Sequence, residues 1–109
     1  MTKNRKQQQV YTLLVEIGRK AGDGLPDSST GGALMVYAAG HDEAEAVREA
    51  VATLKQADTA PLNVTGYGSL AEREADGHDI DVEERALMQR ALDENVVIVA
   101  QMTPFFEDE

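Results

Sequence analysis

Two histidines, His41 and His78, are the side chains in this chain best suited to chemistry near neutral pH. Imidazole can transfer a proton, bind a metal ion or hold an anionic ligand. His41 follows one apolar segment of the chain, Tyr67 and Ser69 lie at the end of the next, and His78 and Asp79 lie shortly before a helix start. If those segments are parallel strands, their carboxyl ends meet at one sheet edge, where helix amino ends attract anions. We therefore predict a small-ligand site at this edge, made of His41, Tyr67, Ser69, His78 and Asp79.

A second interpretation of these five residues stays open, because polar side chains are common in turns beside helix starts and glycines. The sequence contains no H-E-x-x-H pair, no phosphate-binding loop ending in Gly-Lys-Ser/Thr and no G-x-S-x-G elbow. It also contains no cysteine, which excludes thiol catalysis and thiolate metal sites. We expect no catalytic residue, no metal and no cofactor, and no enzyme class is indicated.

Four segments have the composition of strands, being rich in β-branched, aromatic and aliphatic side chains. They are residues 10–17, 33–39, 62–67 and 96–100. The last of them has no polar alternation, which predicts cover on both faces or a central place in the sheet, and we expect it to end before Pro104.

Three helix starts are indicated by a capping residue followed three positions later by glutamate. The capping residues are Asp42, Ser69 and Asp81, which predict helices ending near Ala57, a short one over 69–76, and one ending by Asn95. The polar residues 20–32 form a long loop before the second strand, and such a loop is either functional or merely mobile.

These elements predict an α/β fold that borders on α+β, in the order strand, strand, helix, strand, short helix, helix, strand. We expect a two-layer sandwich in which helices pack on a mixed four-stranded sheet. The segments beginning at Ala33, Leu62 and Val96 would be parallel neighbours joined by right-handed crossovers. The first strand would pair antiparallel with the second. A ferredoxin-like sandwich is the alternative.

Charge is distributed unevenly over the 109 residues, whose net charge is −10. The first 20 residues hold five of the ten cations and one anion, so the rest of the chain carries nineteen anions and five cations. We divide the chain into a flexible basic arm (1–9), one domain (10–106) and an acidic tail (107–109). An acidic body repels phosphate backbones, so we expect no nucleic-acid partner.

The composition further predicts a cytoplasmic chain without membrane contact, because no export signal or membrane-length apolar run is present. With no catalytic signature, we expect a small non-catalytic binding or regulatory module that acts through a protein partner or as a homodimer. A small-ligand binder or enzyme that uses the edge near His41 and His78 is one alternative. An acidic inhibitor or antitoxin-like protein is the other.

Overall fold

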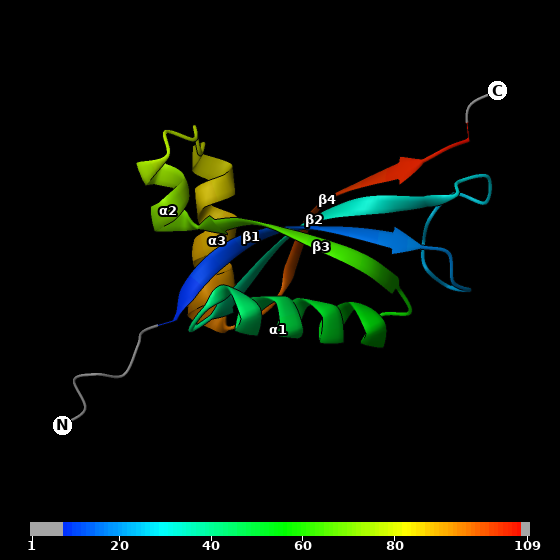
Figure 1. Ribbon diagram of the computed structural model, residues 1–109, viewed down its shortest axis with the longest axis horizontal. Helices are drawn as coiled ribbons and strands as arrows, with labels where there is room; N and C mark the ends of the chain where they lie inside the picture. Colours follow the sequence, from blue (N-terminus) through cyan, green and yellow to red (C-terminus); the bar gives the residue numbers. More distant parts are fainter. Residues whose placement is uncertain (1–7, 108–109) are drawn as a thin grey trace.

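The computed structural model describes residues 8–107, which form an α+β fold of one sheet with helices packed on it (Figure 1). The elements are β1 (Gln9–Gly18), β2 (Gly31–Gly40), α1 (Glu43–Gln56), β3 (Ala60–Ser69), α2 (Leu70–Ala75), α3 (Val82–Glu94) and β4 (Ile98–Phe105). The predicted order of elements is confirmed, including the short helix. Most of the predicted basic arm and all but the first residue of the acidic tail lie outside the described residues. Within residues 8–107 no helix is long and apolar enough to cross a bilayer.

The four strands form a single sheet in the order β3-β1-β2-β4, and every neighbouring pair is antiparallel. The prediction of a mixed sheet with parallel neighbours is therefore wrong. The prediction failed because β1 lies between β2 and β3 in the sheet. These two strands do run in one direction, with α1 connecting them, but they do not touch, and β4 runs the opposite way. The ferredoxin-like alternative fails as well, because the β1–β2 hairpin precedes both helical connections instead of lying between them.

The three helix starts predicted from the sequence are confirmed at Asp42, Ser69 and Asp81. Each side chain accepts a hydrogen bond from the amide three residues later, at 2.9, 3.2 and 2.8 Å respectively. These bonds satisfy amides that have no partner inside the helix. At its other end α3 terminates on Asn95, whose φ of 55° is the left-handed conformation that asparagine tolerates.

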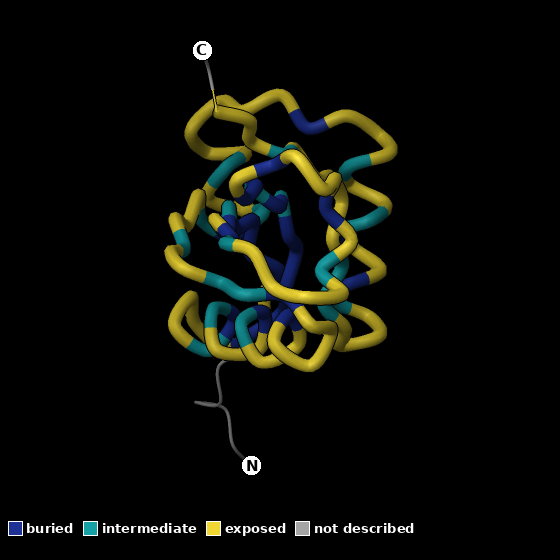
Figure 2. Tube along the Cα trace, turned by 90° about the vertical axis from the view of Figure 1, so that its right-hand side faces the viewer, coloured by how far each residue is buried: buried dark blue, intermediate teal, exposed yellow. Residues whose placement is uncertain are grey.

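The core consists of two apolar clusters on opposite faces of the sheet, because alternate side chains of β1 and β2 point to opposite sides. Between α1 and the sheet lie Leu13, Val15, Val36, Ala50, Leu54 and their neighbours. Between α3 and the other face lie Val10, Tyr37, Ile80, Met88 and Ala91. Figure 2 shows these buried segments at the centre of the molecule, inside an exposed shell.

The two-layer arrangement holds over the half of the sheet nearest the β1–β2 loop, where the face opposite α1 is open. The exposed side chains there are mostly polar: Glu16, Asn63, Thr65, Gln101 and Thr103. At the other end of the sheet α2 and α3 cover this face and add a third layer (Figure 1).

β4 differs most from its prediction, because the most apolar run of the chain belongs to an edge strand. Val96 and Val97 precede the strand, and Pro104 lies inside it. An edge tolerates proline, since its missing N–H can face solvent. The Phe105 carbonyl accepts a hydrogen bond from the Thr30 amide at 2.8 Å, toward β2. By alternation, the main-chain groups of Pro104 point outward.

Leu13 is fully buried in the α1 cluster, so Leu13→Ala removes buried surface and leaves a cavity. We expect this substitution to lower the free energy of unfolding by about 2–5 kcal/mol. Leu62→Ala is the matched control, because Leu62 is 71% exposed, and its effect should stay within about 1 kcal/mol. Urea unfolding of both variants measures the difference; equal losses would contradict the assignment of the core.

Candidate functional site

The two histidines lie in separate polar groups and share no hydrogen bond. His41 follows β2 at the start of α1, where its ring nitrogen Nδ1 is 2.8 Å from the Glu45 carboxylate. The His41 amide donates to the same carboxylate oxygen. His78 follows α2, where its Nδ1 accepts a hydrogen bond from Arg73 Nε at 3.1 Å. The helix that begins beside His41 packs on one face of the sheet, whereas the Arg73 group packs on the other.

The remaining residues of the predicted ligand site have different surroundings. Ser69 is buried as the cap of α2, where its hydroxyl accepts from the Glu72 amide and its own amide donates to the Glu72 carboxylate. Tyr67 is half-exposed on edge strand β3, and Asp79 is exposed in the turn before α3. The carboxyl ends of β2 and β3 do share one end of the sheet, but β1 separates them and β4 begins there.

Arg73 organises a polar cluster that the sequence analysis did not identify. Its Nη1 atom donates to the Thr12 hydroxyl of β1 at 2.9 Å and to the Glu84 carboxylate of α3 at 2.8 Å. The Tyr37 hydroxyl of β2 donates to the same carboxylate oxygen at 2.7 Å. One guanidinium therefore connects α2, α3 and the sheet. A partner 61 residues away along the chain, as Thr12 is, leaves no local sequence signal.

The electrostatics of this cluster favour an ionised Glu84 beside a protonated Tyr37. Burial acts to raise the pKa of Glu84, but hydrogen bonds from Arg73 and Tyr37 outweigh it and hold that pKa below its usual value. Burial, together with the Glu84 carboxylate, raises the pKa of Tyr37. Each of the four side chains in the cluster thus has a hydrogen-bond partner, and together they connect α2 and α3 to the sheet.

An acidic hollow of about 310 Å³ opens beside this cluster, between α3 and the strands β2 and β4. Its walls combine the carboxylates of Asp81, Glu83 and Glu84 with Met35, Tyr37, Leu87, Ala100 and Gln101. None of the five predicted site residues lines it. A second hollow of about 200 Å³ is mainly apolar and lies between the start of β1, α2 and the end of α3.

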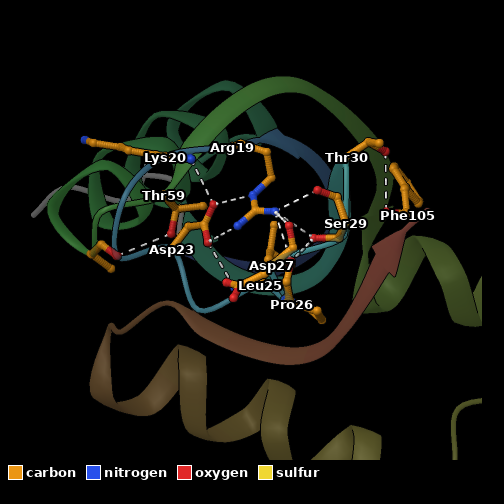
Figure 3. A network of polar contacts seen from close by, with 11 residues as sticks. Arg19, Lys20, Asp23, Leu25, Pro26, Asp27, Ser29, Thr30, Thr59 and Phe105 are labelled. Atoms are coloured by element: carbon orange, nitrogen blue, oxygen red, sulfur yellow. Dashed lines mark hydrogen bonds and ion pairs between the residues drawn. The ribbon is translucent and has the colours of Figure 1, made fainter. Parts of the chain in front are cut away.

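The long loop predicted at residues 20–32 is folded around the guanidinium of Arg19 (Figure 3). Arg19 donates to both Asp23 carboxylate oxygens, at 3.0 and 3.3 Å, and to the carbonyls of Pro26 and Ser29 at 2.9 and 2.7 Å. Leu25 anchors the loop in the α1 cluster. The loop therefore has a defined hydrogen-bonded conformation, and the two alternatives of a functional or a mobile loop stay predictions.

Edge strand β4 and the residue after it expose four large apolar side chains, which lie on both faces of the sheet because Phe105 pairs with Gly31 and alternates with Met102. Val99, Met102, Phe105 and Phe106 are 45%, 44%, 41% and 53% exposed. Val99 and Met102 pair with Val36 and Leu34, so they lie on the α1 face of the sheet, yet α1 contacts mainly the other three strands. Residues 96–106 contain no charged side chain.

The opposite edge, β3, is more polar and is approached by carboxylates. It exposes Asn63 and Thr65 as well as Leu62 and Tyr67. A side chain at Gly66 would collide with the Glu43 carboxylate, and one at Gly68 would crowd Glu72. Two register shifts also interrupt its pairing with β1.

Comparison with known families gives one match. A protein-family model covers residues 10–106, which is nearly the whole described chain. The chain belongs to the family described as Domain of unknown function (DUF8846). The comparisons with curated proteins and with solved structures gave no match. Membership in DUF8846 therefore groups the chain with its relatives without assigning it an activity.

We predict that the contact between Arg19 and Asp23 makes the stability of the folded chain depend on pH. Hydrogen bonds from the Arg19 side chain and from the Lys20 and Leu25 amides lower the pKa of Asp23 from 3.8 to about 2. Because the folded state lowers this pKa, the stabilisation is complete above about pH 4 and is lost as the pH falls toward 2.

Asp23→Asn should therefore lower stability at neutral pH and make the decline in stability between about pH 4 and pH 2 shallower. Asp27→Asn is the control, because Arg19 contacts only the main-chain carbonyl of Asp27. Thermal melts at stepped pH measure both slopes. If the two variants give the same slope, Asp23 does not hold the loop.

Proposed function

We propose that this chain is a small, non-catalytic binding or regulatory module that acts in the cytoplasm through contact of its β4 edge with another protein. The observation that carries the proposal is the exposure of Val99, Met102, Phe105 and Phe106 along an edge strand without charge. Val99 and Met102 lie on the α1 face of this edge and Phe105 on the other face, and apolar side chains exposed along one edge favour a protein contact that covers the edge.

Strand addition is the mode of contact that this edge favours. The outer main-chain groups of an edge strand have no partner within the sheet, so an added strand can hydrogen-bond with them while its side chains cover apolar neighbours. Edge strands that avoid such contacts commonly carry lysine or another charge. β4 has none, although Pro104 and a register shift opposite Met35 and Val36 limit the length of strand that can pair.

An acidic inhibitor remains the second candidate, and the acidic hollow is the observation that favours it. Asp81, Glu83 and Glu84 would attract a basic segment of a partner. Salt distinguishes the two proposals, since screening weakens attraction between opposite charges but leaves apolar burial intact. The small-ligand alternative has less support, because the five residues proposed for it line neither of the two hollows described above.

A photo-activated cross-linking side chain at position 102, introduced in the producing cells, tests the proposed surface. We expect irradiation to join position 102 to a protein and to give a discrete adduct on a denaturing gel. Position 65, exposed on the β3 edge, is the matched control and should give little adduct. Absence of an adduct at 102, or equal adducts at both positions, would refute a β4 contact.

A further inference from the structure

We infer that the protein added at the β4 edge is a second copy of this chain, paired antiparallel through β4 about a two-fold axis at Met102. This inference rests on the proposed function and names its partner. The result would be a continuous sheet of eight strands, with both copies of α1 on the same face.

Charge limits the surfaces through which two copies can meet. Two chains of net charge −10 repel each other over most of their surfaces, so they can meet only where few charges face one another. The segment 96–106 offers such a surface. The β3 strand is also uncharged, and carboxylates approach both edges, so the choice of β4 rests on its exposed Val99 and Met102 and not on charge. A strand edge is moreover complementary to itself under a two-fold rotation.

The position of the axis follows from the main-chain groups that point outward. Phe105 accepts from Thr30 and so points toward β2, which by alternation directs Pro104 and Met102 outward. Pro104 has no N–H, whereas Met102 has both a donor and an acceptor. Two copies centred on Met102 can exchange two hydrogen bonds between these residues.

The neighbouring positions are compatible with this register. It places Pro104 of one copy opposite Ala100 of the other, and Pro104 contributes only its carbonyl oxygen. Ala100 has no partner on β2, because Met35 pairs with Gln101 and Val36 with Val99. The two Met102 side chains would lie on the α1 face beside Val99, covering apolar surface that is exposed in one chain.

The acidic hollow predicts how salt affects this assembly. It includes Ala100 and Gln101 of β4, so the carboxylates of Asp81, Glu83 and Glu84 of the two copies lie on the same face of the joined sheet, one set on each side of the seam. Their mutual repulsion is screened by salt. Association should therefore tighten at high ionic strength, whereas binding of a basic partner to the hollow would weaken.

Light scattering of the purified chain, at micromolar concentration in low and high salt, tests whether a second copy binds. We expect twice the 11.8 kDa chain mass, reached at lower protein concentration in high salt. Met102→Lys should weaken association at least tenfold, because it places two ammonium groups together at the axis. Thr65→Lys on the β3 edge is the matched control and should leave association unchanged.

Disulfide formation tests the register without depending on the lysine variant. The chain has no cysteine, so a cross-link in Met102→Cys reports only the new thiol. Hydrogen-bonded antiparallel residues have Cα atoms about 5.5 Å apart, within disulfide range. We expect oxidation to give a covalent dimer for Met102→Cys and little for Thr65→Cys.

The outcomes of these experiments distinguish a failure of the second-copy inference from a failure of the proposed β4 contact. A monomer in all conditions, together with an adduct at position 102 in cells, would overturn the second copy and leave the β4 contact standing. A dimer in which Cys at 102 fails to cross-link, or cross-links no better than Cys at 65, would overturn the seam at Met102.

Discussion

The hydrogen bonding of β1 on both sides is the constraint on which the architecture depends. β1 pairs with β2 from Gln9 to Ile17 and with β3 through two register shifts, so it is the centre of three adjacent strands. Once β1 occupies this place, β2 and β3 run in one direction without touching, and α1 must cross β1 to connect them. The open side of β2 is then left for β4, which the chain reaches only after α2 and α3. The exposed edge of β4 is thus a consequence of the β1 position.

Different interactions attach the helices to the two faces of the sheet. On one face α1 packs with small and aliphatic residues such as Ala46, Ala50 and Leu54. On the other face Met88 and Ala91 supply apolar contact, and the Arg73 ion pair with Glu84 adds a polar fastening to β1 and β2. A partly buried ion pair needs further hydrogen bonds to offset its desolvation, and Thr12 and Tyr37 provide them. The polar cluster thereby fixes the helices over one end of the sheet.

Local features of the sequence predicted local structure well. Capping residues at Asp42, Ser69 and Asp81 identified three helix starts, and the apolar segments identified four strands, because these signals act within a few residues. Strand neighbours were predicted wrongly, since the pairing of β1 with β3 depends on contacts between distant residues. The candidate ligand site depended on parallel neighbours, so His41 and His78 were not brought together. The uninterrupted apolar run from Val96 indicated burial but could not tell a central strand from an edge strand, which is what β4 is.

The β3 edge has features that hinder the addition of another strand, and these features limit how many chains an assembly could contain. In a pair joined through β4, both free ends of the enlarged sheet would be β3 strands, with Glu43 and Glu72 held against their glycines and two register shifts in their pairing. Such an edge is a poor template for a third chain. In such a pair, each chain would have one paired edge and one edge that resists strand addition, which favours a closed dimer over a growing fibre.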